Sequence, residues 1–200
     1  MYKGETYWGI VIFANITIFK ILTPPVYSLE RLEKHCRSWI KKYPMAYSPR
    51  WFLAQLYKDY KKNEEAKKEY EEIQLLGYMT DKDRIDFGEV LFRLENYQGA
   101  IQTLISVIDK YPRHKNANYF LGINYMKKEE FEKASVYLEK VILAGSRRYE
   151  DYWHLGFCFG NSGQLEKARE AYQNALILKP DSIELKKNLE SIQMRIKRSS

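Results

Sequence analysis

The chain has 200 residues, of which 45% are hydrophobic and 15% aromatic, enough apolar material for one domain with a buried core. Its net charge of +7 sits at the two ends: residues 1–46 hold seven basic and three acidic residues, residues 47–182 hold 21 of each, and residues 183–200 hold five and two. A nucleic-acid-binding surface needs positive charge along its length, so nucleic acid is disfavoured as a partner. Basic ends fit a membrane surface or an acidic partner better.

Residues 1–26 form an apolar N-terminal segment. Residues 7–22 (YWGIVIFANITIFKIL) hold a single charged residue, Lys20, and two prolines follow at positions 24 and 25. The apolar run of residues 7–22 is shorter than the roughly 20 residues that span a bilayer, and the segment lacks the features of a cleavable signal peptide. Three interpretations stay open: a short membrane anchor, an interfacial helix, or an arm that packs on the protein as a degenerate first helix.

The localisation follows from the same segment. If residues 1–26 are an anchor, the flank that follows them is more basic than the flank that precedes them. This asymmetry predicts that the rest of the chain stays in the cytoplasm, on the inner face of the membrane.

Residues 27–46 are expected to form one helix, with Ser28 as a partial N-cap. Its apolar side chains recur at helical spacing on one face, at Leu29, Leu32, Cys36, Trp39 and Ile40. The helix is in register with the second helices of the repeats that follow, so it is interpreted as part of a degenerate unit. Cys36 and Cys158 both fall on apolar faces, which predicts buried free thiols rather than a disulfide.

A 34-residue period organises the rest of the chain, in four units at 47–80, 81–114, 115–148 and 149–182. Two columns of small side chains return in every unit. The first column holds Ala54, Gly88, Gly122 and Gly156, and the second holds Ala66, Ala100, Ala134 and Ala168. We expect these residues to let paired helices approach closely, because a larger side chain would push the helices apart.

On these residues, together with Leu155, Tyr172, Ala175 and Pro180, the chain resembles the tetratricopeptide repeat (TPR), with its pattern W-L-G-Y…A…F…A…P. The resemblance implies an all-α fold, a right-handed α-solenoid of helix hairpins. Residues 183–200 are expected to form a capping helix and basic tail. This helix should turn its apolar residues toward the array: Ile183, Leu185, Leu189, Ile192 and Ile196.

The resemblance also implies a binding groove, because in this family the first helix of each unit lines a concave surface that holds the ligand. The groove columns correspond to Trp51, Gln55, Lys58, Ile85, Glu89, Phe92, Tyr119, Ile123, Met126, Trp153 and Phe157. Exposed apolar surface of this kind marks a binding site. The columns that hold Asn in the family's carboxylate clamp carry Gln55, Glu89, Ile123 and Phe157, which favours an apolar peptide or helix as ligand over a C-terminal carboxylate.

The family therefore implies a non-catalytic adaptor or scaffold whose protein or peptide partner the sequence does not name. No enzyme activity, cofactor or metal is expected, because the three histidines fall in different units and no catalytic motif is present. Alternatives stay open for the groove, which the N-terminal segment or a second copy of the chain could fill. Residues 1–26 could also organise a membrane-tethered or self-associating scaffold, that is, a homo-oligomer.

Overall fold

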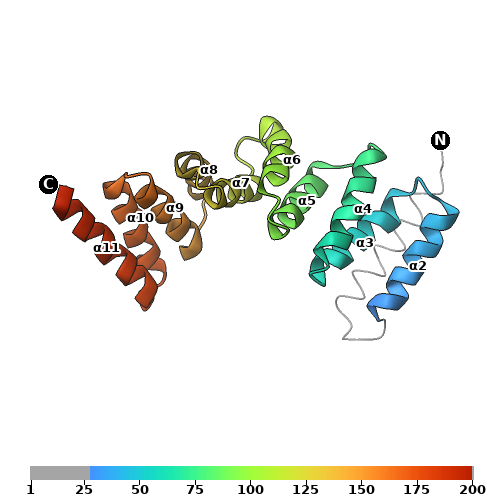
Figure 1. Ribbon diagram of the computed structural model, residues 1–200, viewed down its shortest axis with the longest axis horizontal. Coiled ribbons are helices and arrows are strands. Elements are labelled where there is room, and N and C mark those ends of the chain that lie inside the picture. Colours follow the sequence, from blue (N-terminus) through green and yellow to red (C-terminus); the bar gives the residue numbers. More distant parts are fainter. Residues whose placement is uncertain (1–27, 200) are drawn as a thin grey trace. The chain divides into compact units, whose positions relative to one another are not determined.

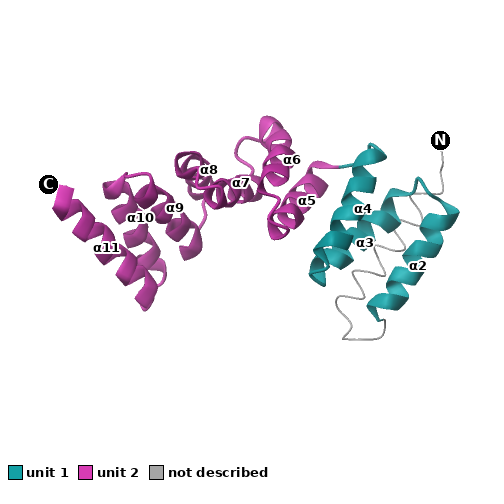
Figure 2. Ribbon diagram, viewed as in Figure 1, with its two compact units in different colours: residues 1–79 teal, residues 80–200 magenta. Residues whose placement is uncertain are grey.

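The computed structural model describes residues 28–199, which are built from α-helices and the turns between them (Figure 1). The expected all-α fold of successive helix hairpins is confirmed. The interpretations of residues 1–26 lie outside the described residues. The chain divides into two compact units, residues 1–79 and residues 80–200 (Figure 2). Across residues 28–199, no helix combines the length and apolar character that crossing a membrane requires.

Unit 1 contains three described helices, α2 (Leu29–Lys42), α3 (Tyr47–Asp59) and α4 (Asn63–Leu75), with α3 packed between the other two. The predicted N-cap forms, because the Ser28 hydroxyl accepts a hydrogen bond from the Arg31 amide at 3.3 Å. α2 buries only Cys36, which is a free thiol, as is the buried Cys158 of unit 2. The core of the α3–α4 hairpin consists of Leu53, Ala54, Tyr57, Ala66, Tyr70 and Ile73.

A buried carboxylate joins the three helices of unit 1. Glu69 of α4 is almost completely buried. It pairs with Arg37 of α2 at 2.5 Å and with Arg50 of α3 at 3.5 Å. Arg37 also donates a hydrogen bond to the Tyr57 hydroxyl at 3.4 Å, and burial raises the pKa of that phenol to about 12. The guanidinium groups compensate the charge of Glu69, which would otherwise be too costly to bury.

The described residues of unit 2, 80–199, form seven helices: α5 (Asp81–Arg93), α6 (Tyr97–Lys110), α7 (Lys115–Lys127), α8 (Phe131–Leu143), α9 (Tyr149–Asn161), α10 (Leu165–Leu178) and α11 (Ile183–Ser199). The pairs α5–α6, α7–α8 and α9–α10 are hairpins. Successive hairpins pack through α6 on α7 and α8 on α9, and α11 packs on α10. Each hairpin therefore covers an apolar face of its neighbour, as in other helical-repeat arrays.

The small columns hold the helices of each hairpin close together. A Cβ atom added at Gly88 would lie 2.8 Å from Leu104, and one at Gly122 would lie 2.7 Å from Leu138. At Gly156 the distance to Tyr172 would be 2.9 Å. All three distances are shorter than van der Waals contact, so even a methyl group at these positions would require the facing side chain to shift.

The last helix covers the end of the array with a narrower apolar stripe than the sequence predicts. Leu185 and Ile192 are buried, and Leu189 and Ile196 pack against the same core. Ile183, however, is 70% exposed, so its expected place on this stripe is wrong. It precedes Leu185 by two residues, which places it about 200° around the helix from the buried face.

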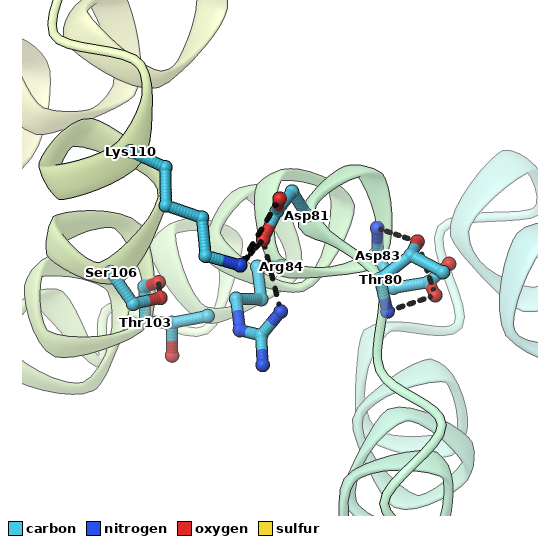
Figure 3. A network of polar contacts seen from close by, with 7 residues as sticks. All are labelled: Thr80, Asp81, Asp83, Arg84, Thr103, Ser106 and Lys110. Carbon is cyan, nitrogen blue, oxygen red and sulfur yellow. Dashed lines mark hydrogen bonds and ion pairs between the residues drawn. The ribbon is translucent and has the colours of Figure 1, made fainter.

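The start of α5 is fixed by a reciprocal cap (Figure 3). The Asp83 amide donates to the Thr80 hydroxyl at 3.2 Å, and the Thr80 amide donates to the Asp83 carboxylate at 2.9 Å. Next to this cap, Asp81 accepts from Arg84 at 3.1 Å and from Lys110 of α6 at 3.2 Å. The cap satisfies two helix-end amides, and the Lys110 contact ties the two ends of the α5–α6 hairpin together.

We expect the substitution Thr80→Ala to lower the free energy of unfolding by about 1 kcal/mol, the usual contribution of an N-cap hydroxyl. Urea denaturation followed by circular dichroism measures this change. Thr103→Ala is the matched control, because the Thr103 hydroxyl only donates to the Gly99 carbonyl within its own helix. An equal loss in both variants would contradict a capping role for Thr80.

Candidate functional site

The eleven predicted groove residues fall into two sets, because Trp51, Gln55 and Lys58 belong to α3 of unit 1 and the other eight belong to unit 2. All three residues of α3 are half-buried. Gln55 donates a hydrogen bond to the Tyr70 hydroxyl at 2.7 Å, so its amide is already used within the α3–α4 hairpin.

The three predicted residues of α5 have different surroundings. Ile85 is buried in a core cluster with Leu104 and Leu121. Glu89 accepts from Arg93, one helical turn later, at 2.5 Å. Phe92 is half-buried, and its ring centroid lies 5.9 Å from that of Tyr97. On this helix, Phe92 offers apolar surface, whereas the Ile85 side chain is covered.

The remaining predicted residues lie on α7 and α9, which contact each other. Ile123 is buried, and Met126 is half-buried against the core of the last two hairpins. Tyr119, Trp153 and Phe157 keep partial exposure, and Phe157 is 36% exposed. Of the predicted residues on α7 and α9, the three aromatic side chains therefore provide most of the accessible surface.

These aromatic side chains form a continuous row, which we call the aromatic face: Tyr119, Phe131, Trp153, His154 and Phe157. The His154 ring lies between those of Tyr119, at 5.9 Å, and Trp153, at 4.9 Å. Trp153 stacks on Phe157 at 5.9 Å, and Phe157 meets Phe131 of α8 edge-on at 5.8 Å. Contacts at these centroid distances are favourable and hold the rings in place.

Two members of the aromatic face were not among the predicted groove residues. His154 packs between two rings of the face, those of Tyr119 and Trp153. Phe131 is the first residue of α8 and lies outside the first-helix columns, so no groove column includes it. In the sequence, the aromatic character of Phe131 at the start of a second helix is what could have indicated its place in the aromatic face.

A charged group borders the aromatic face at Tyr119. The Arg148 guanidinium lies over the Tyr119 ring, 4.7 Å from its centroid. Asp151, which is buried, accepts hydrogen bonds from the Arg148 Nε at 3.1 Å and from the Ser146 hydroxyl. The hydrogen bond to Asp151 raises the pKa of Arg148, so this arginine stays charged and fixed over the ring.

The centre of the aromatic face carries no charge at neutral pH. Burial lowers the pKa of His154, and the Nδ1 atom of His154 and the Nε1 atom of Trp153 are both covered by neighbouring atoms. Burial also raises the pKa of the Tyr119 phenol, which keeps that group neutral. A face of neutral rings suits an apolar ligand better than an ionic one.

The hollows on the surface of unit 2 lie apart from the aromatic face. Shallow hollows lie on α10, beside Gln173 and Ile177, and on α11, beside Ser191 and Met194, away from the predicted groove residues. Among residues 28–199, no three His, Cys, Asp or Glu side chains are placed to hold a metal ion.

Comparisons with known proteins identify the repeats. Family models described as "Tetratricopeptide repeat" match residues 91–155 and residues 149–182. No curated protein matches the chain by sequence.

Among solved structures, MamA 41-end from Desulfovibrio magneticus RS-1 is similar at a TM-score of 0.68 and 24% identity, over 85% of this chain and 88% of that one. A second MamA structure gives a TM-score of 0.74 and 18% identity, over 90% and 94%. YrrB, described as a TPR protein with an unusual peptide-binding site, is similar at a TM-score of 0.73 and 19% identity, over 82% of this chain and 84% of that one.

Fold and repeat matches together define a helical-repeat protein assembled from successive hairpins. Residues 91–182 are tetratricopeptide repeats, and the fold of the described residues is that of TPR proteins. At these identities the structural matches establish the fold, and the ligand has to be argued from the residues of this chain.

Proposed function

We propose that the chain is a non-catalytic scaffold that binds an apolar peptide or helix of a partner protein on the aromatic face of unit 2. The observation that carries this proposal is the row of ring contacts from Tyr119 through His154 and Trp153 to Phe157. Rigid aromatic side chains with partial exposure are the most frequent anchors at protein interfaces. The description of YrrB as a protein with a peptide-binding site lends support from the same fold.

The chemistry of the face determines the type of ligand. Its centre is neutral, and the cation beside it, Arg148, is already paired with Asp151. Of the columns that hold Asn in carboxylate-binding relatives, Ile123 is buried, and Gln55 and Glu89 bond within their own hairpin or helix. These features favour leucine-, isoleucine- or phenylalanine-rich segments that insert side chains between the rings over segments that present a terminal carboxylate.

The half-buried residues of α3, Trp51, Gln55 and Lys58, are proposed as a separate contact surface in unit 1. Of the three, Trp51 offers apolar area and Lys58 a cation, so this surface would suit a mixed segment. Its role is secondary to the aromatic face, because Gln55 already holds Tyr70.

The proposal is tested with Trp153→Ala in the full chain. Peptides are first selected from a displayed random library against the wild-type chain, and their affinity is measured by fluorescence anisotropy. Because an aromatic anchor contributes roughly 2 kcal/mol or more at an interface, we expect the dissociation constant to rise about 30-fold. Phe157→Ala, at a more exposed position, should weaken binding in the same direction.

Tyr60→Ala is the matched control, because Tyr60 is an exposed aromatic residue at the turn after α3 in unit 1. Circular dichroism confirms that each variant stays helical. If the selected peptides bind Trp153→Ala and Tyr60→Ala equally well, the aromatic face is not the binding surface. Tighter peptide binding after removal of residues 1–26 would instead identify that segment as a competing occupant.

A further inference from the structure

Unit 2 carries several strongly exposed aliphatic side chains at one edge of its helix array. Because each hairpin reverses the chain, α6, α8 and α10 end at the edge where α7, α9 and α11 begin. Leu143 is 85% exposed at the last residue of α8, and Ile177 is 74% exposed at the end of α10. Ile183, at the start of α11, is 70% exposed. Tyr111, in the turn between α6 and α7, is 53% exposed. We call this surface, with residues 111–114, 144–148 and 179–182, the loop edge.

The loop edge is also basic. Its three connecting segments contain four basic residues and one acidic residue, Asp181. One of the four, Arg148, is neutralised by Asp151 at the start of α9, which leaves a net charge of +2. Arg113 and Arg147 are exposed and form no ion pair within residues 28–199. The Nζ atom of Lys179 lies 3.0 Å from the Tyr149 hydroxyl and 4.1 Å from the centroid of the Tyr149 ring. Lys179 forms no ion pair with a carboxylate of the described residues. Cations therefore flank the exposed aliphatic residues along the edge.

The opposite edge of unit 2 has neither property. Its connecting segments are residues 94–96, 128–130 and 162–164, which contain one lysine and three glutamates, a net charge of −2. None of these nine residues is an exposed large apolar side chain. The lysine of these segments, Lys128, is paired with Glu130 at 2.8 Å. The combination of exposed aliphatic groups and unpaired cations is therefore specific to one edge rather than a general feature of the repeats.

We propose that the loop edge of unit 2 binds the surface of an anionic lipid bilayer. Leu143, Ile177 and Ile183 would enter the boundary between head groups and acyl chains, and the flanking arginines would contact lipid phosphates. Charge complementarity identifies this occupant, since anionic head groups match the net positive charge of the edge. The proposal is independent of the aromatic face and of residues 1–26.

Other occupants fit these residues less well. A nucleic acid strand is bound by rings that stack on its bases, whereas the most exposed apolar residues of the edge are aliphatic. A protein partner requires a contiguous and complementary apolar patch, whereas here the apolar side chains protrude from three separate helix ends. Separate aliphatic tips on adjacent hairpins are better suited to insertion in a bilayer interface.

The test is co-sedimentation of the full chain with vesicles of phosphatidylcholine alone and of phosphatidylcholine mixed with phosphatidylserine. We expect stronger binding to the anionic vesicles, and weaker binding as salt is added, because salt screens the cations. The double substitution L143D/I177D should lower the partition coefficient roughly tenfold or more, since it removes two inserted side chains and adds two negative charges. Residues 1–26 are present in every variant, so their contribution to binding cancels.

Leu75→Asp is the matched control, because Leu75 is 81% exposed and ends α4 at the same repeat position, where the last turn holds no basic residue. The proposal is overturned if the wild type binds both vesicle types equally or neither, or if Leu75→Asp has the same effect as L143D/I177D. A smaller oligomer in gel filtration for L143D/I177D, with vesicle binding unchanged, would assign the edge to a second copy of the chain and also overturn it.

Discussion

The substitution Gly122→Leu is expected to lower the free energy of unfolding by about 3 kcal/mol, the upper part of the usual range for overpacking a core. A Cβ atom alone at this position would lie 2.7 Å from Leu138 Cγ and 2.8 Å from Leu138 Cδ2. Leu138 is completely buried between helices, so any shift of its side chain must displace other core atoms. The α7–α8 hairpin must therefore separate to admit the new side chain, and urea denaturation followed by circular dichroism measures the cost.

Asn116→Leu is the control for this prediction, since it adds the same side chain to an exposed position of the same helix. We expect its effect to stay within about 0.5 kcal/mol, as for most surface substitutions. A second variant, G122A/L138A, should be less destabilised than the sum of its single substitutions, because each change makes room for the other. Simple additivity in that cycle would show that contact with Leu138 is not the reason for glycine at position 122.

The fold follows from the sequence to an unusual degree because its main constraint is local and repeated. A small residue is required wherever two helices of a hairpin approach, and the requirement returns every 34 residues at Gly88, Gly122 and Gly156. Periodicity therefore reveals both the hairpins and the residues that hold them together. The sequence wrongly predicts that Ile183 faces the array, because Ile183 is the first residue of α11. At a helix terminus no preceding turn shows which face the apolar stripe follows.

The candidate site was less predictable, because exposure depends on how neighbouring helices pack. The family columns identify Tyr119, Trp153 and Phe157, yet the same columns include Ile85 and Ile123, which the structure covers. Column position specifies the direction of a side chain from its own helix. It does not specify how far the adjacent hairpin reaches over it, and that distance decides which groove residues stay accessible.

Charged residues show the same limit more clearly. The segment 64–72 contains four further glutamates besides Glu69. By composition alone, all five would be placed on a solvent-exposed face of the helix. Glu69 differs in its spacing, three residues after Ala66 and four before Ile73, which places it on the buried stripe of α4. That spacing could have predicted its burial. Its partners could not be predicted, because Arg37 and Arg50 come from two other helices.

We expect Glu69→Gln to lower the free energy of unfolding of unit 1 by about 3 kcal/mol, the usual cost of removing one partner from a buried ion pair. The amide keeps the volume of the carboxylate but removes the buried counter-charge of Arg50, whose side chain is 12% exposed and keeps only the half-exposed Glu72 as a carboxylate partner among residues 28–199. Hydrogen exchange locates the effect: amides of α2, α3 and α4 should exchange faster, whereas those of α7 to α10 should keep their protection.

Glu72→Gln provides the control, because Glu72 also contacts Arg50, at 3.4 Å, but its side chain is 47% exposed. An exposed ion pair contributes little, so we expect a change below about 1 kcal/mol. The double substitution E69L/R50L should be less destabilising than Glu69→Gln, because it removes the buried charges together. If Glu69→Gln and Glu72→Gln cost the same, or if protection falls equally in both units, the buried carboxylate is not what holds α2 and α3 to α4.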